Sequence, residues 1–70
     1  MDIGHAVQAM QEGRRVTRAG WNGKDMWLAY QGQTGGAWQP FIYMRTVQGT
    51  FVPWLCSQTD LLATDWEVVG

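Results

Sequence analysis

The chain of 70 residues has few of the groups that disulfides, metal sites or membrane insertion require. Cys56 is its only cysteine, so no internal disulfide can form and no cysteine-based metal site of ordinary spacing is available. No segment approaches the roughly 20 apolar residues of a membrane span, and the N-terminus MDIGHAVQAM lacks the apolar run of a signal peptide. We therefore expect a soluble chain in a reducing, intracellular compartment.

Charge is scarce as well. Five Lys and Arg residues stand against six Asp and Glu residues, which gives a formal net charge of -1. Proteins that bind DNA or RNA usually carry an excess of positive charge, because they must neutralise phosphates. We expect neither DNA nor RNA nor a membrane among the partners.

Groups for catalysis are equally few. His5 is the only histidine and falls in the first turn of an expected helix, where a solvated side chain is the commoner case. Cys56 has no base near it in the sequence, so we expect a buried, unreactive thiol. We identify no nucleophile, base and orienting group, and predict no enzyme, metal or cofactor. Asp25, Asp60 and Asp65 are candidates for accepting hydrogen bonds from a base or a ribose.

Aromatic residues, by contrast, are abundant: five Trp, two Tyr and two Phe. A domain of this size buries only about 60% of the surface that its unfolded chain exposes. Part of the aromatic area must therefore lie near the surface, at a subunit interface or in a ligand pocket.

The patterning predicts one α+β domain over residues 1–70. Apolar residues at helical spacing predict a helix over 3–12, with Asp2 as its N-cap. Asn22-Gly23 predicts a two-residue turn in a hairpin over 15–30, and Gln48-Gly49 predicts the turn of a second hairpin. Ser57 and Asp60 resemble a capping box at the start of a short helix, which the strand WEVV follows. The expected fold is a small antiparallel sheet of two hairpins and a closing strand, with an N-terminal and a short C-terminal helix.

A two-residue turn fixes which side chains share a face of the first hairpin. It places Trp21 opposite Lys24 and Arg18 opposite Trp27, and it puts Met26, Leu28 and Tyr30 on the core face with Thr17 and Ala19. The other face then carries Trp27 and Ala29 with Val16 and Arg18. An aromatic plane beside a cation suits a purine joined to a phosphate, although Arg and Trp pairs are also common surface features. Both interpretations of Trp27 stay open.

The remaining tryptophans receive different predictions. We expect Trp54 and Trp66 to belong to the core and to pack against Leu61 and Leu62. Trp38, in a Gly-rich connection over 31–39, is a lid, an interface anchor or a poorly packed residue. The second hairpin has mixed apolar residues on both faces, which predicts that another subunit covers one of them. Its faces are Ile42, Met44 and Thr46 on one side and Phe41, Tyr43, Arg45 and Val47 on the other.

Three segments carry a family resemblance: TRAGWNGKDMWL (17–28), PFIYM (40–44) and VPWLCSQTDLLATDWEVV (52–69). They resemble phage proteins of the second Thoeris anti-defence family. The resemblance implies a single sponge-like domain that sequesters cyclic nucleotide immune messengers without cleaving them, in the cytoplasm of the infected bacterial host. It also implies a homotetramer with ligand pockets between subunits. The implied ligands are glycocyclic ADP-ribose of Thoeris defence and, in some members, cyclic di- or trinucleotides of CBASS defence.

Carried onto this chain, the resemblance marks two segments as pocket residues: Trp21, Asn22, Gly23 and Lys24, and then Ser57, Gln58, Thr59 and Asp60. We expect an adenine to stack on Trp21 or Trp27, phosphates to meet Lys24, Arg18 or Arg45, and Asn22, Thr59 and Asp60 to contact the ribose or base. The chain departs from the family pattern in its short 31–39 connection and in Cys56, where alanine is usual. The alternatives are a module that inhibits a host protein and a messenger-degrading phosphodiesterase.

Overall fold

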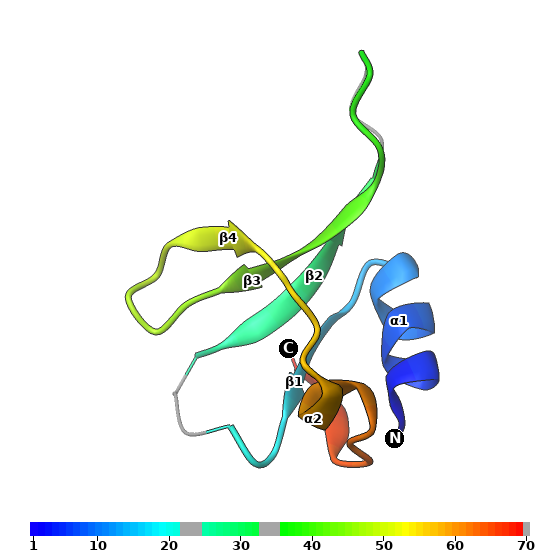
Figure 1. Ribbon diagram of the computed structural model, residues 1–70, viewed down its shortest axis with the longest axis vertical. Helices are drawn as coiled ribbons and strands as arrows, with labels where there is room; N and C mark the ends of the chain where they lie inside the picture. Colours follow the sequence, from blue (N-terminus) through cyan, green and yellow to red (C-terminus); the bar gives the residue numbers. More distant parts are fainter. Residues whose placement is uncertain (22–24, 33–35, 70) are drawn as a thin grey trace.

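The computed structural model describes residues 1–21, 25–32 and 36–69, which form two helices and a five-stranded antiparallel sheet (Figure 1). The strand order is β4-β3-β2-β1-β5, so the last strand of the chain lies at the edge beside β1. This arrangement confirms the predicted α+β fold of two hairpins, a closing strand and two helices. The elements are α1 (Ile3–Gln11), β1 (Arg15–Arg18), β2 (Trp27–Gln31), β3 (Phe41–Arg45), β4 (Phe51–Pro53), α2 (Gln58–Leu61) and β5 (Trp66–Val69).

Helix α1 begins and ends as its sequence predicts. The Asp2 carboxylate accepts the backbone N–H of His5 at 2.9 Å, which satisfies one of the free donors of the first turn. After Gln11 the chain leaves the helix at Gly13, whose φ of 92° is the left-handed value that glycine adopts at little cost. His5 is exposed, as expected. None of the described helices is long and apolar enough to cross a membrane.

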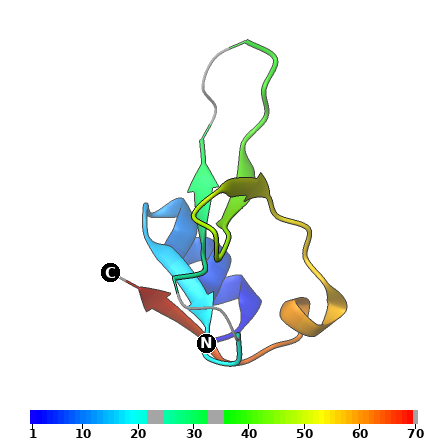
Figure 2. The same cartoon turned by 90° about the vertical axis from the view of Figure 1, so that its left-hand side faces the viewer.

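The core lies between α1 and one face of β1, β2 and β5. Ala6 and Met10 of the helix pack against Val16, Leu28 and Trp66 of the three strands, and each of the five is at most 2% exposed. In Figure 2, α1 lies behind β1 and β2, so the face of the sheet toward the viewer has no described helix over it. We call this second face the open face.

The predicted register of the first hairpin is wrong by one residue. Val16 pairs with Leu28, and therefore both lie on the core face, whereas the predicted pairing of Arg18 with Trp27 would have separated them. Arg18 pairs with Trp66 of β5, and Asp65 accepts the backbone N–H groups of Ala19 and Gly20, so the end of β1 is bonded to a segment far away in the sequence. A slip of one residue turns every β1 side chain to the other face of the sheet. Thr17 and Arg15 thus share the open face with Trp27, and the predicted turn at Asn22-Gly23 lies outside the described residues.

Two further expectations need correction. Trp66 belongs to the core and Trp54 packs against it, as predicted. The two rings contact each other, with centroids 5.9 Å apart. Leu62, a predicted partner, is 75% exposed, because the one-turn helix α2 leaves it outside the core. Cys56 was expected to be buried and is exposed. The residues around it, 55–59, are all exposed, so no packing surface covers the thiol.

The second hairpin turns at Gly49 as predicted, and its first strand, β3, has the predicted faces. Met44 pairs with Val52, and Tyr43 pairs with Pro53. Gly49 closes the turn with a φ of 84° and donates its N–H to the carbonyl of Thr46 at 2.9 Å. Met44 therefore joins the core side, while Tyr43 lies on the open face.

Candidate functional site

Three aromatic rings meet on the open face, one from each of β2, β3 and β4. Trp27 and Tyr43 have ring centroids 6.1 Å apart, Trp27 and Phe51 are 6.0 Å apart, and Tyr43 and Phe51 are 5.5 Å apart. These separations are those of favourable edge and tilted contacts. We call Trp27, Tyr43 and Phe51 the aromatic platform.

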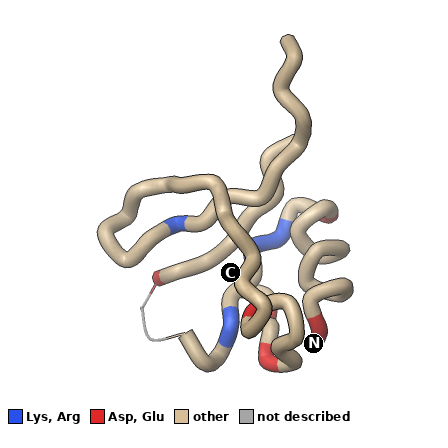
Figure 3. The backbone as a smooth tube through the Cα atoms, in the orientation of Figure 1, with Lys and Arg blue, Asp and Glu red and all other residues tan. Residues whose placement is uncertain are grey.

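Two guanidinium groups border the platform. The Cζ atom of Arg15 lies 4.9 Å from the centre of the Trp27 ring, which is cation–π geometry. Arg45 is the cross-strand partner of Trp27, and its Nη1 donates to the carbonyl oxygen of Asp25 at 2.7 Å. The cation over Trp27 is thus Arg15 and not the predicted Arg18, because of the register shift in the first hairpin. Figure 3 shows that the basic positions of the described trace lie at separate places and do not gather in one basic patch.

Two hollows adjoin the platform. A groove of about 510 Å³ is lined mainly by apolar residues, and a polar hollow of about 350 Å³ lies beside Trp27. Both volumes fall in the range of about 300 to 1,000 Å³ that small-molecule pockets occupy. The apolar groove is lined by Gln31, Trp38, Phe41, Tyr43, Phe51, Val52 and Pro53, and the polar hollow by Arg15, Thr17, Arg18, Ala19, Asp25, Met26, Trp27, Glu67 and Val69.

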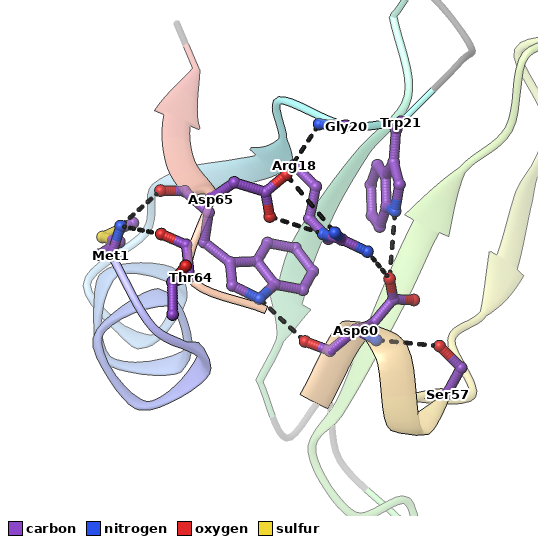
Figure 4. Close-up of polar contacts among 9 residues, drawn as sticks. Met1, Arg18, Gly20, Trp21, Ser57, Asp60, Thr64 and Asp65 are labelled. Carbon is purple, nitrogen blue, oxygen red and sulfur yellow. Dashed lines mark hydrogen bonds and ion pairs between the residues drawn. The ribbon is translucent and has the colours of Figure 1, made fainter. Parts of the chain in front are cut away.

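A second polar cluster lies where β1 ends, and Arg18 is its centre (Figure 4). Its Nη1 contacts the carboxylate of Asp60 at 2.8 Å, and its Nε contacts that of Asp65 at 2.7 Å. The Arg18 side chain is only 16% exposed, so two charge-assisted bonds hold it out of bulk water. The hydrogen bond from Arg18 lowers the pKa of Asp65 below its ordinary value, and the same pair raises the pKa of Arg18.

Trp21 belongs to the same cluster. Its Nε1 donates to Oδ1 of Asp60 at 3.3 Å, and its ring meets that of the buried Trp66 edge-on at 5.4 Å. Ser57 accepts the backbone N–H of Asp60 at 3.1 Å and so caps α2 as predicted. The Asp60 carboxylate, however, turns to Arg18 and Trp21 and does not complete a capping box with Ser57. We call Arg18, Trp21, Asp60 and Asp65 the Arg18 cluster.

The structure therefore divides the predicted site residues into separate groups. Arg18, Trp21, Ser57 and Asp60 lie together at the Arg18 cluster. Trp27 and Arg45 lie on the open face. Gln58 and Thr59 are exposed on α2, and Asn22, Gly23 and Lys24 lie outside the described residues.

Sequence reasoning missed three members of the open face as site residues: Arg15, Tyr43 and Phe51. Tyr43 was correctly placed on one face with Arg45, and that pairing of an aromatic with a cation was the available signal. Arg15 could be identified as a site residue only from the register of β1 against β2. The Asn22-Gly23 signal did not predict that register correctly.

Comparison with known proteins agrees with the resemblance seen in the sequence. The model of the Thoeris anti-defense 2-like domain matches residues 1–69. The chain is similar to a protein named Thoeris anti-defense 2 from Bacillus phage SP01. The two are 31% identical over 85 aligned positions, which cover 100% of this chain and 96% of the relative. Both matches extend over nearly the whole chain, so they include the strands of the open face and the Arg18 cluster.

Proposed function

The chain belongs to the Thoeris anti-defense 2-like family of phage anti-defence proteins, and we propose that it sequesters a cyclic nucleotide messenger of bacterial immunity without cleaving it. The proposed ligand is glycocyclic ADP-ribose, and a cyclic di- or trinucleotide is the alternative within the same mechanism. The protein would act in the cytoplasm of the infected host, by keeping the messenger from its effector.

The observation that carries this proposal is the Arg15 guanidinium 4.9 Å above the Trp27 ring, inside a larger aromatic surface. A nucleotide presents a flat base and a charged phosphate a few ångströms apart, and this surface offers a partner for each. Base stacking on an aromatic ring contributes about 1–3 kcal/mol, and an arginine can bind phosphate with two parallel hydrogen bonds. We assign stacking to Trp27 and phosphate contact to Arg15 and Arg45.

The polar hollow beside Trp27 supplies acceptors for the rest of a nucleotide. Asp25, Glu67 and Thr17 line it, and their side chains carry two carboxylates and a hydroxyl. Such groups accept hydrogen bonds from ribose hydroxyls or from a base amino group. A cyclic messenger that places a base on Trp27 would therefore have partners for its sugar in the same hollow.

Arg18 and Asp60 do not suit the roles of ligand contacts that the sequence assigned to them. Each is already bonded to the other, and a phosphate on Arg18 would have to compete with two carboxylates. Breaking such a partly buried pair leaves a charge without its partner, which costs more than an exposed contact returns. The phosphate role therefore passes to Arg15 and Arg45.

A sponge must bind tightly, since it competes with an effector by mass action. Nanomolar affinity corresponds to about -12 kcal/mol. One stacked base cannot supply this free energy alone, but two bases with charge-assisted phosphate contacts can approach it. We propose that a homotetramer brings a second aromatic surface to the ligand. The exposed apolar residues of the open face, such as Trp38 at 71% and Phe51 at 61%, are available for contacts between subunits.

A thermal-shift panel tests the proposal. The protein is heated with glycocyclic ADP-ribose, linear ADP-ribose, a cyclic dinucleotide or a cyclic trinucleotide. We expect a shift of several degrees with one cyclic ligand, larger than that with linear ADP-ribose, because at equal concentration a tighter ligand stabilises the folded state more. Arg15→Ala should reduce this shift, whereas Arg14→Ala serves as the matched control. No shift with any of the four would contradict sequestration and favour a module that binds a host protein.

A further inference from the structure

The residue two places before Trp27 has a strained backbone conformation. Among the described residues other than glycine, Asp25 alone has a positive φ, at 63°. Most side chains disfavour this left-handed region, whereas glycine adopts it at little cost and aspartate tolerates it better than most. Glycine at this position would relieve the strain but would also remove the side chain. Retained strain of this kind is typical of positions where the side chain has a function.

Side chains from two neighbouring strands hold the segment Asp25-Met26 in place. From β3, Nη1 of Arg45 donates to the carbonyl oxygen of Asp25 at 2.7 Å. From β1, the Thr17 hydroxyl donates to the carbonyl oxygen of Met26 at 2.8 Å. The Arg45 guanidinium also lies close to the turn of the second hairpin, where a Cβ atom added to Gly49 would be 3.4 Å from Nη2. The left-handed backbone is therefore fixed through carbonyl groups, and the Asp25 carboxylate takes no part in these bonds.

The position of Asp25 joins the two parts of the proposed ligand site. Asp25 is exposed and lines the polar hollow beside Trp27. Its carbonyl oxygen contacts the Arg45 guanidinium, which has several N–H donors, so this one bond leaves others for a phosphate. A phosphate on Arg45 would place the ribose that it esterifies within a few ångströms of Asp25. The two oxygens of a carboxylate can accept hydrogen bonds from neighbouring ribose hydroxyls.

We propose that Asp25 binds the ligand through its carboxylate and that its strained backbone is retained for this role; this inference rests on the proposed function. The ligand class that follows is a nucleotide whose phosphorylated ribose presents free hydroxyls to the carboxylate. Arg45 bonds the carbonyl oxygen and thereby keeps Asp25 beside the phosphate. Replacing Asp25 with glycine should then affect stability and binding differently, because the strain and the ligand contact are removed together.

Three substitutions separate the backbone of Asp25 from its carboxylate. Asp25→Gly removes both the strain and the side chain. Asp25→Asn keeps a residue that tolerates the left-handed region but removes the charge, and Asp25→Ala places a less tolerant residue there. Glu12→Gln is the matched control. It removes one negative charge, as Asp25→Asn does, at an exposed position after α1, and α1 covers the opposite face of the sheet.

Urea unfolding should show that Asp25→Gly is at least as stable as the wild type and that Asp25→Ala is less stable. In calorimetric titration with glycocyclic ADP-ribose, both variants should bind roughly 10-fold more weakly or worse, because a hydrogen bond to a charged group is lost. Asp25→Asn should lose less, since its amide oxygen still accepts a hydrogen bond. Glu12→Gln should bind within about twofold of the wild type, because distant exposed charges are screened. Loss of a negative charge alone would favour an anionic ligand, so weaker binding indicates a direct contact.

Three results would overturn the proposal. Wild-type affinity in Asp25→Gly would make Asp25 a turn residue only, and a clear loss of stability in Asp25→Gly would show that the backbone carries no strain. An equal loss of affinity in Glu12→Gln would assign the effect to net charge. A wild type that binds neither glycocyclic ADP-ribose nor a cyclic di- or trinucleotide refutes the proposed function itself, whereas a wild type that binds and an Asp25→Gly variant of equal affinity refute only the role of Asp25.

Discussion

Replacing Trp27 with alanine should separate ligand binding from folding. The change removes the ring on which we place a base, and loss of one stacked base weakens binding by about 1–3 kcal/mol, or about 5- to 150-fold. The cost in folding comes from two aromatic contacts, at 6.1 and 6.0 Å, and from the cation–π contact of Arg15. Each contact is worth about 0.5–1.5 kcal/mol, so the three together are worth about 1.5–4.5 kcal/mol, and partial exposure places their sum near the lower end.

The assay pairs calorimetric titration with urea unfolding. A 70-residue domain has a free energy of unfolding of roughly 3.5–10 kcal/mol, so Trp27→Ala should remain mostly folded at 25 °C. Trp27→Phe keeps a smaller stacking plane and should lose less affinity than Trp27→Ala. Wild-type affinity in a folded Trp27→Ala variant would refute the assignment of the platform, and Trp21 would then be the stacking residue.

Three other predictions follow from named contacts. Trp66→Ala should lower the free energy of unfolding by about 3–5 kcal/mol, because Trp66 is 2% exposed. Leu62→Ala, at a 75% exposed position, should change it by less than about 0.5 kcal/mol. Equal urea midpoints for the two variants would contradict the described core. Arg18 lowers the pKa of Asp65 below 3.8, so the stability from the Arg18–Asp65 pair is complete above about pH 4 and is lost as the pH falls through the lowered value. Asp65→Asn should be less stable than wild type at pH 7 and should lose less stability on acidification. Parallel acid-unfolding curves for the two proteins would count against the pair. Light scattering at micromolar concentration should give the mass of a tetramer, and a monomer mass would remove the second aromatic surface from the proposed mechanism.

Local sequence signals predicted much of the fold, because the interactions behind them are local. Asp2 caps α1 through a residue three positions away, and Ser57 caps α2 in the same way. Gly49 adopts the positive φ that its turn requires. The alternation over residues 41–47 correctly placed Tyr43 on the opposite face from Met44.

The first hairpin shows where such reasoning fails. Asn22-Gly23 is a strong local signal for a two-residue turn, but β1 also pairs with β5, and Asp65 binds two backbone N–H groups just after Arg18. That interaction spans more than 40 residues of sequence, so no local pattern contains it. The shift of one residue exchanged Arg18 for Arg15 as the cation over Trp27. It also turned Arg18 toward Asp60 and Asp65, which changes its role from a ligand contact to a structural one.

Recovery of intact ligand tests the central claim most directly. The protein is incubated with a slight molar deficit of glycocyclic ADP-ribose for several hours, the free ligand is removed by filtration, and the protein is then denatured by heat. Sequestration predicts that the filtrate before heating is nearly free of messenger and that chromatography after heating returns it chemically unchanged, with much less retained by the Trp27→Ala variant. Messenger that stays in the first filtrate, or linear ADP-ribose in place of the cyclic form after heating, would contradict the account.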